Sequence, residues 1–121
     1  MAERSGADRR RVRRYPTRHR VEGTALEGRV SFRGILSDLS VGGCRLHLDR
    51  GILPGAAIEA LCDIAGLGLR FLGQMVWAEP GPGGVVHGVR FTGFGSEADA
   101  LFHSLYVGRL ARQAPASPQA G

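Results

Sequence analysis

Short stretches of alternating apolar and polar residues, separated by turns rich in glycine and proline, fill the middle of the chain. The clearest is GGCRLHLD at 42–49, where Cys44, Leu46 and Leu48 are expected to face inward and Arg45 outward. This period of two residues is typical of a strand with one buried face. The predicted strands cover residues 20–30, 31–40, 42–49, 57–65, 67–79 and 85–94. Strands at such short spacing predict a mainly β fold, a six-stranded antiparallel β-barrel.

The same alternation predicts which side chains share a face in two of the other strands. It groups Phe32, Gly34, Leu36, Asp38 and Ser40 in one, and Leu69, Phe71, Met75 and Trp77 in the other. Trp77 is therefore either a core residue or, at the edge of the barrel, a surface platform on which a base stacks.

The period changes at residue 96, where a C-terminal α-helix of about 96–112 is predicted. Ser96 is a good N-cap, and Asp99 three residues later resembles a capping box. Apolar residues then recur at helical spacing and define a face expected to dock on the barrel: Ala98, Leu101, Phe102, Leu105 and Leu110.

We predict one domain over 13–112, flanked by a disordered basic arm (1–12) and a disordered tail (113–121). No apolar run is long enough for a membrane span, and the N-terminus has no apolar signal region, so a cytoplasmic location is expected. Cys44 and Cys62 are expected to be buried thiols. The spacing of cysteines and histidines predicts no metal site.

Positive charge is concentrated at the N-terminus. Residues 1–20 hold eight arginines against two acids, whereas the other residues hold eight arginines against nine acids. Such an arm is typical of proteins that bind a polyanion, whether nucleic acid, a nucleotide or an anionic membrane surface. All the basic residues are arginine, whose planar fork suits phosphate and the guanine edge. A general preference for arginine over lysine in the genome explains the absence of lysine equally well.

Two short motifs stand in order within this framework. Asp38, Ser40 and Gly43 fit the pattern D/N-x-S-x-x-G, and Arg14 and Arg18 fit R-x-x-x-R. Arg13 gives the second motif a doubled first arginine. Earlier registers of the same motif, Arg9 with Arg13 or Arg10 with Arg14, stay open; the register from 14 to 18 is favoured because it leads directly into the first strand.

Together the two motifs resemble the PilZ domain, a bacterial six-stranded barrel that binds cyclic di-GMP. GQMVWAE at 73–79 resembles the penultimate strand of that family, and HGVRFTGF at 87–94 resembles its closing strand. The resemblance covers about 13–110. It implies a receptor for cyclic di-GMP, bound in many relatives as a stacked dimer, that passes the signal to an unidentified effector protein.

The resemblance also implies the site residues. Arg14 and Arg18, supported by Arg13, are expected to grip guanine and phosphate as part of a flexible arm. Asp38 accepts from guanine or holds an arginine, Ser40 donates to phosphate or base, and Gly43 permits close approach. Further contacts are assigned to Arg10, Gly42, Trp77 and Arg90. Each has a simpler alternative: a solvated basic tail, turn formation by Asp38, Ser40 and the glycines, or core packing.

Two other functions remain as alternatives. A small β-barrel with a basic arm is also compatible with nucleic-acid binding, although the nearly neutral barrel argues against it. The other alternative is a PilZ-like adaptor that binds proteins and no nucleotide. An enzyme is not expected, because the sequence contains no nucleophile–base pair, carboxylate pair or P-loop, and no cofactor is expected beyond the nucleotide ligand.

Overall fold

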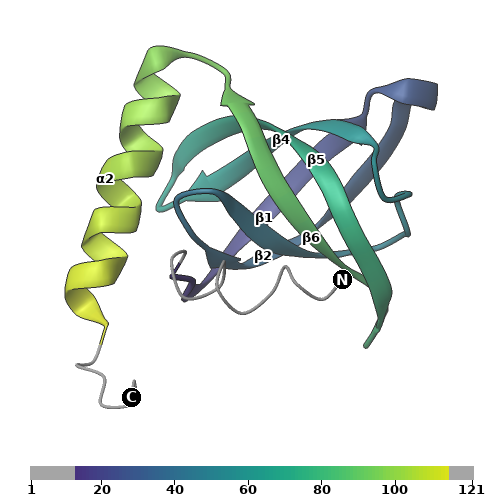
Figure 1. Cartoon of the computed structure of the whole chain (residues 1–121), viewed down its shortest axis with the longest axis horizontal. Coiled ribbons are helices and arrows are strands. Elements are labelled where there is room, and N and C mark those ends of the chain that lie inside the picture. The colour runs from purple at the N-terminus through teal and green to yellow at the C-terminus, as the bar shows by residue number, and fades with distance from the viewer. Residues whose placement is uncertain (1–12, 115–121) are drawn as a thin grey trace.

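A closed barrel of six antiparallel strands with one helix against its outer side forms the structure, a computed structural model that describes residues 13–114 (Figure 1). The strands are β1 (Tyr15–Ala25), β2 (Val30–Leu39), β3 (Gly43–Leu48), β4 (Ala57–Ile64), β5 (Leu67–Gly81) and β6 (Gly84–Phe94). A 3₁₀ turn, η2 (Glu27–Arg29), follows β1, and the helix is α2 (Glu97–Gln113). The predicted fold class is confirmed.

The strands follow the order β1-β2-β3-β6-β5-β4, and β4 pairs back onto β1. Every strand therefore pairs with two partners over part of its length, and the barrel has no edge strand. The long connection from β3 to β4, residues 49–56, joins two strands that are not neighbours in the barrel, whereas each of the other connections joins neighbouring strands. Helix α2 packs against β1, β5 and β6, near the first residues of β1 (Figure 1).

Alternate side chains fill the barrel interior. The largest fully buried ones are Phe71, Leu36, Leu39, Leu46, Ile58, Leu69, Met75, His87 and Cys62. The predicted inward face of β3 is confirmed, and both cysteines are buried and free. Burial raises the pKa of the Cys62 thiol to about 12 and that of Cys44 well above its ordinary value.

The first strand differs from its prediction. The stretch 20–30 was expected to form it, but β1 begins five residues earlier, at Tyr15, and ends at Ala25. The chain then turns through η2, where Gly28 has a φ of 80°. Tyr15 and Pro16 pair with Leu39 and Asp38 of β2. The segment that carries Arg18 is thus part of the sheet, and the expected flexible arm does not include it.

Two register shifts overturn the predicted parities. Between Leu36 and Asp38 the pairing of β2 with β3 slips by one residue, and Leu39 rather than Asp38 turns inward. Between Met75 and Trp77 the pairing of β5 with β6 slips in the same way. Each β-bulge inserts one residue and reverses the faces that follow. Asp38 and Trp77 therefore lie on the outside of the barrel.

Helix α2 begins as predicted, but only part of the predicted face, Phe102 and Leu110, packs on the barrel. The Ser96 side chain accepts a hydrogen bond from the Asp99 backbone N–H at 3.1 Å. His103 and Val107 are buried, whereas Leu101 and Leu105 are 61% and 62% exposed. Phe102, Tyr106 and Leu110 are partly buried against the core. Sequence periodicity misses the rest of the docked face because two polar side chains, His103 and Tyr106, anchor it.

Within residues 13–114, no helix has the length and apolar character needed to cross a membrane.

Candidate functional site

Four neighbouring strands bring one residue each into a row across the outside of the barrel. Asp38 on β2 pairs with Arg45 on β3, Arg45 pairs with Gly88 on β6, and Gly88 pairs with Trp77 on β5. Residues paired in this way lie one strand spacing apart, about 5 Å. The two bulges matter here, because without them Asp38 and Trp77 would point into the core. We call this set the Asp38–Trp77 row.

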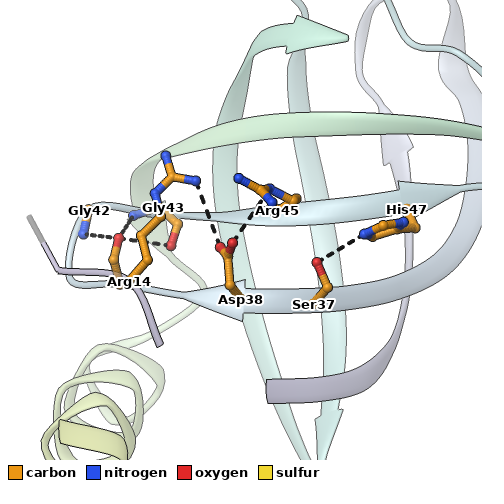
Figure 2. A network of polar contacts seen from close by, with 8 residues as sticks. Arg14, Ser37, Asp38, Gly42, Gly43, Arg45 and His47 are labelled. Carbon is orange, nitrogen blue, oxygen red and sulfur yellow. Dashed lines mark hydrogen bonds and ion pairs between the residues drawn. The ribbon is translucent and has the colours of Figure 1, made fainter. Parts of the chain in front are cut away.

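Asp38 lies between two guanidinium groups. Its Oδ2 lies 3.5 Å from Nε of Arg45, and its Oδ1 lies 3.9 Å from NH1 of Arg14, the residue that precedes β1. Figure 2 shows both arginines directed at this carboxylate from opposite sides. The Asp38 side chain is 14% exposed, and the two arginines are 44% and 42% exposed. A carboxylate that is mostly shielded from water is thus paired with two accessible cations.

The turn from Ser40 to Gly43 follows directly. The Ser40 hydroxyl accepts from the backbone N–H groups of Gly42 and Gly43, at 3.2 and 3.0 Å, and donates to the Gly43 carbonyl at 3.2 Å (Figure 2). Ser40 is buried, so its hydroxyl shapes the turn. A Cβ on Gly43 would lie 2.1 Å from the Val89 carbonyl oxygen, whereas one on Gly42 would meet nothing within 4 Å.

Trp77 forms the far end of the row. A Cβ on Gly88 would lie 2.2 Å from the indole nitrogen, which means that the ring lies over this glycine. The Arg45 guanidinium carbon lies 5.8 Å from the ring centroid, within the range of a cation–π contact. Trp77 therefore lies on the outer surface and is not a core residue, and its role as a platform for a base stays a prediction.

Arg90 lies next to the turn. It pairs with Gly43 across the β3–β6 ladder, is exposed, and donates a hydrogen bond to the Gln74 side chain. Its guanidinium therefore adds a cation to the same outer face as the Asp38–Trp77 row.

The remaining predicted arginines lie at different distances from this row. Arg18 on β1 lines an open hollow of about 450 Å³ together with Ser37 and His47, one step along the strands from the row. Among residues 13–114, Arg18 forms no ion pair. Arg13 is exposed. Arg10 lies outside the described residues, as do Arg9 and therefore both earlier registers of the motif. The arm predicted to be disordered, 1–12, also lies outside them. Of the tail predicted to be disordered, 113–121, only residues 113 and 114 are described, and Gln113 is the last residue of α2.

Two hydrogen-bonded contacts join α2 to the site. His103 donates through Nε2 to the Ser40 carbonyl at 2.9 Å, with its ring between Phe91 and Phe94.

The second contact joins Tyr106 to β1. The Tyr106 hydroxyl lies 2.8 Å from Nε2 of His19 and 3.1 Å from Oγ1 of Thr17, the two residues on either side of Arg18. Burial lowers the pKa of both His103 and His19.

Arg45, His103 and Tyr106 were not predicted as site residues. The alternation in β3 already placed Arg45 outward, two residues after Gly43, so its position in the row could have been inferred. The helix contacts carry no such signal, because they join residues far apart in the sequence across a docking angle that periodicity does not set.

The outer face as a whole presents guanidinium groups, a shielded carboxylate, an indole ring and a glycine turn. Guanidinium groups bind phosphate, a carboxylate accepts hydrogen bonds from amide-like N–H groups, and an aromatic face stacks on a planar base. The combination suits an anionic ligand that carries a flat heterocycle with N–H donors.

Comparisons with known proteins agree with this description. A family model described as the PilZ domain matches residues 8–106. The PilZ domain of YcgR from Escherichia coli, solved with c-di-GMP, superposes with a TM-score of 0.66 at 19% identity, covering 87% of this chain and 93% of that chain. The PilZ domain of CeSA from a cellulose-synthesizing bacterium gives 0.60 at 17% identity, with 82% and 98% covered.

Inhibitor of motility from Bacillus subtilis (MotI/DgrA) gives a TM-score of 0.67 at 11% identity, covering 88% of this chain and 54% of that one. At these identities the solved structures establish a shared fold. A search of curated proteins found no match.

Proposed function

The chain belongs to the PilZ domain family, a family of regulatory binding domains, and we propose that it is a receptor for cyclic di-GMP. The observation that supports this most directly is the shielded Asp38 carboxylate, which lies between Arg14 and Arg45 in a row that ends at Trp77. The YcgR domain solved with c-di-GMP has the same barrel, which supports the choice of ligand.

Each residue of the site has a proposed role. Arg14 and Arg18, with Arg13 beside them, contact phosphate and the O6 and N7 acceptors of guanine, which a guanidinium fork binds in bidentate fashion. Asp38 accepts from N1–H and N2–H2 of guanine. Arg90 adds positive charge beside the turn.

The turn and the indole complete the proposed site. Gly42 lets the ligand approach the backbone closely, Gly43 lets β3 lie against the Val89 carbonyl of β6, and Ser40 acts by holding the turn in shape. Trp77 stacks on a guanine, a contact that contributes about 1–3 kcal/mol in single-stranded nucleic-acid binding. Two ligand molecules stacked as a dimer would use both the row and the hollow beside Arg18.

We also propose that the bound state is read by an effector protein. Helix α2 is the element suited to this relay, because it touches the turn through His103 and β1 through Tyr106. A ligand that moves either contact changes the position of the helix. Which protein recognises the helix is a separate question from ligand binding.

Titration calorimetry with cyclic di-GMP, cyclic di-AMP and GTP tests the proposal. We expect binding of cyclic di-GMP at micromolar concentration or tighter, and no binding of the other two. The affinity should fall only weakly with salt, since a single small anion releases few counterions, whereas tracking along nucleic-acid phosphates gives a steep slope. Absence of cyclic di-GMP binding would contradict the proposal and favour the adaptor alternative.

A further inference from the structure

Arg45 contacts both Asp38 and Trp77 in the free protein. Its Nε lies 3.5 Å from Oδ2 of Asp38, and its guanidinium carbon lies 5.8 Å from the indole centroid. Neither Nε of Arg45 nor Oδ1 of Asp38 forms a hydrogen bond among the described residues, although both atoms are buried. The side chain is thus oriented by one carboxylate and one aromatic ring, the two groups that the proposed function assigns to a guanine.

The chemistry of the two groups explains why they suit both partners. The Watson–Crick edge of guanine carries N1–H and N2–H2 on a carbon bonded to three nitrogens, which is the guanidine pattern of arginine. Both are planar, both donate two parallel hydrogen bonds to a carboxylate, and both stack on an aromatic face. Arg45 therefore contacts the same two groups as the base would, through an ion pair with Asp38 and a cation–π contact with Trp77.

The backbone fixes this arrangement. Arg45 pairs directly with Asp38 on one side and with Gly88 on the other. Because Gly88 has no side chain, the indole of Trp77 lies across β6 and reaches Arg45. An arginine at this position of β3 has both partners within its reach without leaving the sheet surface.

We infer that Arg45 occupies the guanine position of the free site and must leave it before the nucleotide binds. This inference rests on the proposed function and adds a means of setting its affinity. Arg45 acts as an internal competitor, so its removal should tighten binding of cyclic di-GMP. Exposed ion pairs and cation–π contacts are individually weak, and we expect a gain of about three- to tenfold.

The test compares Arg45→Ala and Arg45→Lys with the wild-type chain. Lysine keeps the positive charge and lacks the planar fork, so both variants should bind cyclic di-GMP more tightly in calorimetry. If Arg45 instead contacts phosphate in the complex, Arg45→Ala will bind more weakly and Arg45→Lys will stay near wild type, which would overturn the inference. Arg109→Ala, at an exposed position on α2, removes the same charge and should leave the affinity unchanged.

Trp77 supplies a readout that needs no ligand. It is the single tryptophan of the chain, so fluorescence reports on this position alone. Acrylamide should quench it faster in both Arg45 variants than in the wild type, and unchanged quenching would overturn the inference. If neither the wild type nor the variants bind cyclic di-GMP, the proposed function fails, whereas binding that is weakened by both substitutions overturns the role of Arg45 alone.

Discussion

His103 on α2 donates a hydrogen bond to the carbonyl oxygen of Ser40, at 2.9 Å and 63 residues away in the sequence. Both residues are buried, so the carbonyl has no access to water if the imidazole is removed. The contact joins the C-terminal helix to the turn that carries Gly42 and Gly43. It therefore links the stability of the helix docking to the shape of the proposed ligand site.

Replacing His103 by alanine should both destabilise the protein and weaken the binding of cyclic di-GMP. Leaving a buried acceptor without a partner costs about 1–3 kcal/mol, and loss of the ring between Phe91 and Phe94 adds to it. Urea unfolding measures the first effect, and calorimetry with cyclic di-GMP measures the second. Ser104→Ala, at the exposed neighbouring position, is the control and should change neither. Unchanged stability in His103→Ala would show that the contact is not formed in solution.

The two turn glycines should respond differently to alanine. At Gly43 the new Cβ would meet the Val89 carbonyl at 2.1 Å, so β3 and β6 must separate, at a cost of about 2 kcal/mol or more. At Gly42 the new Cβ meets nothing within 4 Å, and the change should stay within about 0.5 kcal/mol. Denaturant midpoints of the two variants decide this, and equal midpoints would contradict the geometry of the turn.

Replacing Arg14, Arg18 or Asp38 by alanine should lower the affinity for cyclic di-GMP at least tenfold, which corresponds to about 1.4 kcal/mol of binding free energy. Each substitution removes a charge-assisted contact to base or phosphate, and all three positions lie on the barrel surface, so the melting temperature should change little. Calorimetry on each variant gives the affinity, with Arg109→Ala as the matched loss of one exposed charge. Wild-type affinity in Arg18→Ala and Asp38→Ala would leave the ligand possible but the site assignment wrong.

Acid should destabilise the protein through its buried histidines. Burial lowers the pKa of His19, His87 and His103 below the ordinary value of 6.5. The unfolded chain therefore takes up protons first, and the free energy of unfolding should fall as the pH drops from 6.5 toward the lowered values. Thermal melts between pH 7.5 and 5.5 measure this slope, and a melting temperature that rises on acidification would contradict it.

His87 offers a variant that tests the origin of the slope. Its Nε2 accepts a hydrogen bond from the Ile52 backbone N–H at 2.9 Å, an interaction that a protonated ring cannot make. His87→Gln keeps an acceptor and does not titrate in this range. It should show a shallower dependence of the melting temperature on pH than the wild type.

The sequence alone was sufficient to predict the barrel, because the alternation of apolar and polar residues and the glycine and proline of the turns are local signals. Through the motifs it also singled out Asp38, Arg14 and the turn glycines, which the structure brings together. It failed where one inserted residue reverses a strand face: the bulges at Ser37 and Val76 depend on cross-strand pairing and have no period of their own. That failure concealed the most useful relationship, the alignment of Asp38, Arg45 and Trp77 on one surface.

The docked face of α2 was predicted only in part, for a related reason. Periodicity weighs Leu101 and Leu105 above His103 and Tyr106, because it scores apolar character. The barrel instead binds the helix through a histidine and a tyrosine whose partners, Ser40, Thr17 and His19, are polar and more than half the chain away. Polar anchors of this kind are visible only once the two surfaces are placed together.

The double attachment of α2 makes it a lever. Its 17 residues span about 25 Å, and about 15 Å of that length extends beyond His103 toward the C-terminus. A tilt of about 5° at the two attachment points would carry the free tip sideways by about 1 Å, a displacement as large as those that distinguish functional states at many subunit interfaces. A slight motion of the Ser40 turn would thereby be magnified at a distance, at the C-terminal end of the helix.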